Sequence, residues 1–205
     1  VGDSHAAHWQ PALDRAGKGQ GWQIVALTKS SCPATTARVR HTINTGRAYA
    51  ECSSAHRDIL TRVALVKPDL VVLSSMVWDG DDWQGVGRRA WLAGVTEFAS
   101  ELHIAGARKV LWLGDVPKPG SNIPECLSAH PDSIASCAPE PGAAWNAEIE
   151  AEVEEATRAG GGLYEATHQW LCVVSGCPVI VGNLLVYRDD SHLTREASRW
   201  LSEEL

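Results

Sequence analysis

The chain has 205 residues and is 44% hydrophobic, and its 18 Lys and Arg against 25 Asp and Glu give a formal net charge of −7. This length and composition are typical of one globular domain with a sizeable core, which we expect to span residues 1–205. The acidic balance argues against a nucleic-acid partner, which requires clustered Lys and Arg. No apolar run approaches the roughly 20 residues that a membrane helix needs.

The first half of the chain predicts helices that alternate with short apolar strands. A helix is expected from His5 to Ala16, ending at the glycines that follow, and a strand from Trp22 to Thr28. The segment Cys52–Val66 is amphipathic and predicts a second helix. Asp69–Ser74 is a continuous apolar run of the kind buried on both faces of a parallel sheet.

The second half continues this alternation, with two interruptions. Gly87–Ala105 and Pro141–Ala159 predict helices, and Lys109–Leu113 predicts a strand between them. Val116–Glu140 is rich in proline and predicts a surface loop, and Pro178–Tyr187 predicts a hairpin. Strands that alternate with helices indicate an α/β fold, a three-layer α/β/α sandwich with a mainly parallel sheet.

The cysteines are even in number and fall into neighbouring pairs along the sequence. Three local disulfides are the simplest arrangement, Cys32–Cys52, Cys126–Cys137 and Cys172–Cys177. Such bridges would indicate an oxidising, extracytoplasmic compartment. Buried free thiols are the alternative. A zinc site is the weaker rival because no Cys-x-x-Cys pair is present, so no metal is expected.

Two short polar motifs stand at opposite ends of the chain, Gly2-Asp3-Ser4-His5 and Asp189-Asp190-Ser191-His192. A serine hydroxyl needs an imidazole as its base, and the imidazole needs a carboxylate that fixes its tautomer. We therefore expect Ser4 as nucleophile, His192 as base and Asp189 as the orienting carboxylate. The alternative for Ser4 is an ordinary helix N-cap. The second aspartate of the late motif competes with Asp189 for the carboxylate position.

Further motifs lie between these two ends: Ser31-Cys32-Pro33, Trp170-Leu171-Cys172, and Tyr187-Arg188 directly before the late motif. In this order, the set resembles the SGNH/GDSL hydrolase superfamily. Within it, the set is most similar to the SGNH domain fused behind a membrane-embedded acyltransferase-3 domain in bacterial surface-glycan O-acyltransferases. The resemblance implies a flavodoxin-like SGNH hydrolase fold, and it implies that the chain is one domain excised from a longer membrane-anchored acyltransferase.

The resemblance also implies an oxyanion hole, in which this sequence departs from the superfamily pattern. Donors are expected from the backbone N–H groups of Ser4 and Ser31, but Trp78 stands where an asparagine side chain is usual. The Trp78 indole would then replace that donor, or Trp78 packs in the core. Trp78, Trp83 and His5 are the candidate substrate contacts, with packing as the alternative for the aromatic residues.

The expected function is serine-dependent O-acyl transfer, with acetyl as the group, to a cell-envelope carbohydrate. The resemblance implies an acyl donor delivered by the fused membrane domain and an extracytoplasmic location tethered through an N-terminal part. The serine chemistry needs no cofactor. The lost asparagine donor predicts weak acetylesterase activity in the isolated domain. One alternative is a stand-alone secreted carbohydrate esterase or lipase. The other is a non-catalytic glycan-binding module.

Overall fold

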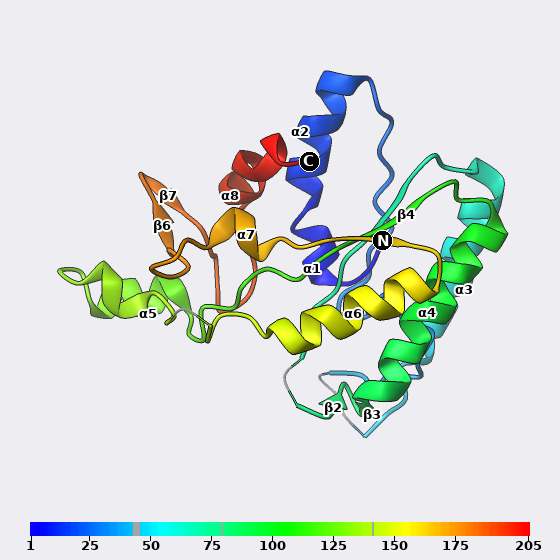
Figure 1. Ribbon diagram of the computed structural model, residues 1–205, viewed down its shortest axis with the longest axis horizontal. Helices are drawn as coiled ribbons and strands as arrows, with labels where there is room; N and C mark the ends of the chain where they lie inside the picture. The colour runs from blue at the N-terminus through cyan, green and yellow to red at the C-terminus, as the bar shows by residue number, and fades with distance from the viewer. Residues whose placement is uncertain (43–45, 79, 141) are drawn as a thin grey trace. The chain divides into compact units, whose positions relative to one another are not determined.

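The computed structural model describes residues 1–42, 46–78, 80–140 and 142–205 (Figure 1). The chain forms two compact units, and each is built from several stretches of sequence. The first comprises residues 1–6, 27–114 and 147–166, and the second comprises residues 7–26, 115–146 and 167–205. The prediction of one domain over the whole length stays a prediction.

The first unit carries the larger sheet and the longer helices. Its elements are α3 (Ala50–Val66), β1 (Val71–Leu73), β2 (Asp82–Trp83), β3 (Val86–Gly87), α4 (Arg88–Ala105), β4 (Val110–Leu113), α6 (Ala147–Ala159) and β5 (Leu163–Glu165). The short helix α1 (Ser4–Ala7) contains residues of both units.

The second unit is made of shorter elements: α2 (Gln10–Gln20), α5 (Ile123–Ala129), the 3-10 helix η1 (Ile134–Cys137), α7 (His168–Leu171), β6 (Ile180–Val181), β7 (Leu184–Leu185), α8 (Arg195–Trp200) and the 3-10 helix η2 (Leu201–Glu203). None of the helices in the described residues is long and apolar enough to cross a membrane.

The sheet of the first unit is parallel and has the strand order β1-β4-β5. The start of the chain extends the sheet at its β1 edge, because Gly2 forms parallel bridges both to Ser74, next to β1, and to Thr28. The Lys29 N–H donates to Gly2 O, and the Ser74 N–H donates to Val1 O. The N-terminal residues thus lie between two other segments of sheet, and they lead directly into α1. The predicted α/β class with a mainly parallel sheet is confirmed.

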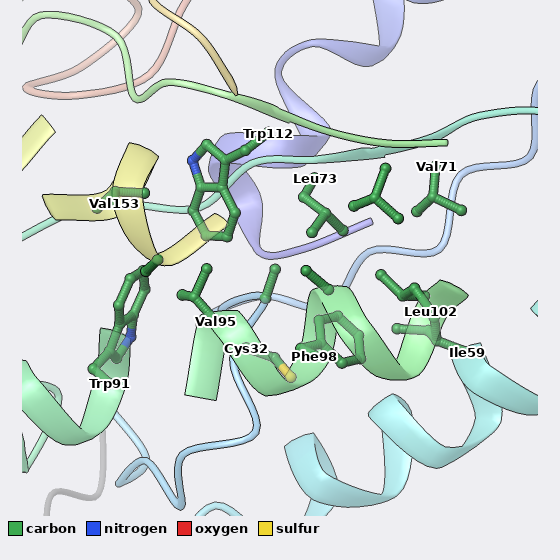
Figure 2. Packing of buried hydrophobic residues seen from close by; sticks show 14 of the residues in the cluster. Cys32, Ile59, Val71, Leu73, Trp91, Val95, Phe98, Leu102, Trp112 and Val153 are labelled. Carbon is green, nitrogen blue, oxygen red and sulfur yellow. The ribbon is translucent and has the colours of Figure 1, made fainter. Parts of the chain in front are cut away.

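One face of α4 forms the centre of the core (Figure 2). Trp91, Val95, Phe98 and Leu102 recur at helical spacing and are all fully buried, where they meet side chains of β1 and β4 and Val153 of α6. Burial of each such side chain stabilises the fold by about 1.5–3 kcal/mol. This packing explains why the periodic segment 87–105 predicts its helix well.

In the second unit, α2 and α8 lie side by side (Figure 1). The Ala12 N–H in the first turn of α2 donates to Ser198 Oγ of α8 at 3.1 Å. The buried indole of Trp9 packs edge-on against Trp170, with ring centroids 5.9 Å apart. The predicted hairpin is present as β6 and β7, which pair antiparallel across Gly182.

Two sequence predictions fail at the start of the chain. The first helix does not end at Gly17 but continues in α2 to Gln20, with Gly21 as its left-handed C-cap. Gly17 is buried inside the helix, and a Cβ there would lie 2.6 Å from Ile24 Cδ1. The glycine therefore allows close packing and does not end the helix. The predicted strand Trp22–Thr28 is also wrong. Only Thr28 forms a bridge, and much of this segment is exposed.

Two further differences lie around α6. This helix begins at Ala147, later than predicted, and Pro141, where it was expected to begin, lies outside the described residues. Strand β5 was not anticipated. It has only three residues and Leu163 is half exposed, so it lacks the apolar run that identifies β1. The loop predicted over 116–140 contains helix α5 and η1, which are joined by a disulfide.

The three predicted disulfides are all present, Cys32–Cys52, Cys126–Cys137 and Cys172–Cys177. No free cysteine remains in the part of the chain that the structure describes. The alternative of buried free thiols is therefore wrong.

Candidate active site

The first half of the candidate site is the turn that precedes Ser4. Gly2 has φ 138°, and a Cβ at this position would overlap the carbonyl oxygen of Ser74. The Asp3 carboxylate accepts hydrogen bonds from the His5 N–H at 2.8 Å and from the Met76 N–H at 3.1 Å. Asp3 therefore ties the turn to the segment that follows β1. Ser4 is partly exposed and is the first residue of α1.

The second half is the Asp189–His192 loop of the second unit. Asp189 Oδ2 lies 2.9 Å from His192 Nδ1, and its Oδ1 lies 3.1 Å from the same nitrogen. Asp190 is exposed and its Oδ1 accepts from Ser191 Oγ at 3.2 Å. The carboxylate that faces the imidazole is thus that of Asp189. A carboxylate at Nδ1 fixes the tautomer that leaves Nε2 as the proton acceptor.

The loop also sets the charge state of this carboxylate. Partial burial alone would raise the pKa of Asp189, but the Ser191 and His192 backbone N–H groups and the His192 imidazole outweigh it, so the pKa is lowered. The two N–H groups donate to Asp189 Oδ1 at 2.9 and 2.7 Å. Asp189 therefore stays ionised at neutral pH and can stabilise an imidazolium.

The loop is held by the elements on both sides of it. The Arg188 N–H donates to His192 O, and the Thr194 N–H donates to Val186 O. The Thr194 side chain accepts from the Ala197 N–H and so caps α8. These bonds fix the backbone from the end of the hairpin to the start of α8, which limits the freedom of the His192 ring.

Ser4 belongs to the first unit, and Asp189 and His192 belong to the second. The structure brings Asp189 and His192 together within their unit. The pairing of Ser4 with His192 stays a prediction.

The backbone N–H of Ser31 is one of the expected oxyanion donors. The φ of Ser31 is +57°, and its N–H donates to no acceptor among the residues that the structure describes. The turn is stabilised by Gln84, whose side-chain amide donates to Ser31 O at 2.6 Å and to Arg40 O at 3.0 Å. A single glutamine belongs to no motif, so this contact of Gln84 could not be predicted from the sequence.

Trp78 is partly buried and packs against the hydrophobic core of the first unit. Its indole N–H makes no hydrogen bond to any residue that the structure describes. Both readings of Trp78 therefore stay open. The neighbouring Met76 N–H is taken by Asp3 and so is not an oxyanion donor.

Two of the candidate substrate contacts are fully buried side chains. Trp83 is 0% exposed, packs edge-on against Trp91, and donates its indole N–H to Gly80 O at 2.8 Å. His5 is also 0% exposed. Their burial favours packing over substrate contact, and a sequence pattern near a strand end does not reveal on which side a side chain is buried.

One cluster has metal-ligand chemistry, Cys32, Cys52 and His56. Its two sulfurs are joined in a disulfide, so neither is a thiolate ligand. His56 Nε2 lies 3.0 Å from Pro33 O and 3.5 Å from Cys32 Sγ. Burial lowers the pKa of His56, against the opposing effect of the Pro33 carbonyl. The cluster is a buried structural feature.

A parallel sheet that leads into the Ser4 turn, together with a late Asp–His pair, defines the SGNH hydrolase fold. A solved structure supports this at a TM-score of 0.79 and 20% identity, covering 98% of this chain and 78% of that one. It is the periplasmic domain of a lipopolysaccharide acetyltransferase from Salmonella ser. Paratyphi A.

The family follows from the sequence itself. A family model described as the SGNH domain fused to AT3 domains matches residues 1–205, so the chain belongs to this family. No curated protein matches the chain.

Proposed function

We propose that the chain is the serine-dependent catalytic domain of an O-acyltransferase that transfers an acyl group, acetyl in the simplest case, to a cell-envelope carbohydrate. The observation that carries the proposal is the Asp189–His192 pair at 2.9 Å in a chain of this family. An imidazole with a carboxylate on Nδ1 is built to take a proton on its other nitrogen.

In this proposal, Ser4 Oγ attacks the carbonyl carbon of an acyl donor and gives its proton to His192 Nε2. The imidazolium, stabilised by Asp189, returns the proton to the leaving group as the tetrahedral intermediate collapses to an acyl-serine. A sugar hydroxyl then attacks the acyl-serine, with His192 again as base, and the new ester leaves while Ser4 regains its proton.

The developing oxyanion needs hydrogen-bond donors. Ser4 stands at the first residue of α1, and the Ser31 N–H is the second proposed donor. Trp78 stands in place of an asparagine, and loss of one such donor typically costs about 2.7–4 kcal/mol of transition-state stabilisation. A site weakened in this way is expected to hydrolyse esters slowly, which suits a transferase because water is then a poor competitor for the acyl group.

The proposed location is extracytoplasmic, with the donor supplied by a membrane domain fused to this one. Three disulfides fit an oxidising compartment. The family's fusion to AT3 domains supports a membrane acyltransferase partner. The structural neighbour is a lipopolysaccharide acetyltransferase domain, which supports acetyl as the group and a surface glycan as the acceptor.

The direct test is labelling by a fluorophosphonate, followed by hydrolysis of p-nitrophenyl acetate. The wild-type chain should be labelled at Ser4, and Ser4→Ala should lose both label and activity. Ser54→Ala, which removes an exposed serine of α3, should keep both. A wild-type chain that is inert to the probe would refute the catalytic proposal and favour a glycan-binding module.

A second pair of variants tests the carboxylate. Asp189→Asn should lower the rate of hydrolysis by roughly 10⁴-fold, the order found when a triad carboxylate is lost, while Asp190→Asn should leave it unchanged. Equal effects of the two variants would contradict the role of Asp189.

A further inference from the structure

A groove of about 590 Å³ lies on the second unit between α2 and α8. Its α2 side is one helical face, because the lining residues recur every three or four positions. Its α8 side consists of two residues four apart. The lining residues are Ala7, Gln10, Pro11, Asp14, Arg15, Lys18, Arg195 and Arg199.

The charge of this groove is opposite to that of the whole chain. Arg15, Lys18, Arg195 and Arg199 line it against the single carboxylate of Asp14, in a chain of formal net charge −7. None of the four cations makes an ion pair or a side-chain hydrogen bond with any residue that the structure describes. Elsewhere exposed arginines do find partners, as Arg158 does with Glu154 at 2.7 Å.

The walls of the groove are fixed before any ligand arrives. The Ala12 N–H bond to Ser198 Oγ joins the two helices at 3.1 Å, and Thr194 caps α8 directly before Arg195. Pro11 lies in the first turn of α2, where its ring pre-organises the helix. Four cations around the single carboxylate of Asp14 leave an excess of positive charge in the groove, and a bound anion would relieve their mutual repulsion.

We propose that this groove binds an anionic segment, carrying phosphate or carboxylate groups, of the glycan that accepts the acyl group. Guanidinium groups bind both anions through paired hydrogen bonds. The inference rests on the proposed function. Chain connectivity supports it, because Ala7 follows Ser4 by three residues and Arg195 follows His192 by three.

A glycan fits these observations better than an anionic membrane does. A bilayer presents an extended surface, and the net charge of −7 would repel it as a whole. A discrete anionic group can instead enter a groove of this volume and be surrounded by its cations. The acceptor would thus be selected by its charge, apart from the acyl chemistry.

The test is a calorimetric titration with oligogalacturonate, a glycerol-phosphate oligomer, and fully methyl-esterified oligogalacturonate, which has the same sugar chain without charge. The two anionic probes should bind, more weakly as salt is raised, and the neutral probe should not. Arg195→Gln with Arg199→Gln should weaken binding by roughly tenfold or more, since each removes a charge-assisted contact. Arg57→Gln with Arg62→Gln removes two exposed charges from α3 and should change it less than about twofold.

The outcomes separate the groove from the catalytic proposal. The titration is repeated with Ser4→Ala, so binding is measured without turnover. Anion binding by a chain that lacks esterase and transferase activity would support the groove and refute the proposed function. Activity without binding of either anionic probe, or equal losses in both double variants, would overturn the groove. Binding only to vesicles that contain phosphatidylglycerol would also overturn it, in favour of a membrane surface.

Discussion

Substitution of Gly2 by alanine tests whether the backbone before Ser4 is as constrained as its surroundings indicate. Gly2 lies between Thr28 and Ser74 in the sheet and has φ 138°, a conformation that L-residues rarely adopt. A Cβ would overlap Ser74 O and lie 3.0 Å from Ala6 Cβ. The obstacle on one side is a backbone carbonyl, so it cannot turn away as a flexible side chain would.

The expected cost has two parts. The unfavourable φ costs about 1–3 kcal/mol in an alanine. A shift away from Ser74 also strains the hydrogen bonds from Lys29 N–H to Gly2 O and from Ser74 N–H to Val1 O, each worth about 1 kcal/mol. We therefore expect Gly2→Ala to lower the free energy of unfolding by about 3–5 kcal/mol. A displacement of about 1 Å at Ser4 would reduce ester hydrolysis by roughly 100-fold.

Urea unfolding measures the first effect, and p-nitrophenyl acetate hydrolysis, on the fraction that remains folded, measures the second. Gly19→Ala is the matched control. Gly19 lies inside α2 with open space around it, so alanine should stabilise the chain by about 1 kcal/mol and leave the rate unchanged. A Gly2→Ala chain within about 0.5 kcal/mol of wild type and fully active would refute this account of the turn.

Three other predictions concern features away from that turn. Replacement of Cys32 and Cys52 by alanine should lower the free energy of unfolding by about 3 kcal/mol in urea, because the bridge closes a loop with a sequence separation of 20; no loss would contradict a bridge that stabilises the fold. The pKa of His56 is lowered from 6.5 by burial, so the unfolded chain binds a proton that the folded chain does not, and stability should fall as pH drops below about 6.5. Between about pH 7 and pH 5, His56→Gln should reduce the dependence of the free energy of unfolding on pH by up to about 1.4 kcal/mol per pH unit, and an unchanged dependence would assign the effect to other groups. Trp78→Asn should speed hydrolysis of p-nitrophenyl acetate if the missing oxyanion donor limits the rate, whereas an unfolded or unchanged chain would assign Trp78 to packing. Trp83→Asn is the control, because it removes a fully buried tryptophan and so shows the effect of lost packing alone.

The sequence predicts those elements whose periodicity is enforced by burial. Helix α4 is read correctly because Trp91, Phe98 and Leu102 must all face the core, and β1 and β4 are read correctly because they are apolar on both faces. The prediction fails where a local signal is overridden by packing. Gly17 has the identity of a helix terminator, but its neighbour Ile24 needs the space that a glycine leaves inside α2.

The candidate site divides in the same way. The spacing from Asp189 to His192 is a property of a single turn, so the sequence identifies the pair and the structure brings the two side chains into contact. Burial of Trp83 and His5 depends on distant segments, and a sequence near a strand end cannot reveal it. The cluster of cations in the α2–α8 groove could not be predicted either, because Arg15 and Arg195 are far apart in sequence.

The disulfide pattern has a consequence for how the chain matures. Each bridge joins a cysteine to the next one along the chain, with sequence separations of 20, 11 and 5. A polypeptide that enters an oxidising compartment with its N-terminus first can therefore close every bridge in the order of its emergence, as soon as the second cysteine arrives. Because no native bridge has to wait for a later segment, a strong oxidant that pairs cysteines as they appear would produce the native set without later reshuffling by an isomerase.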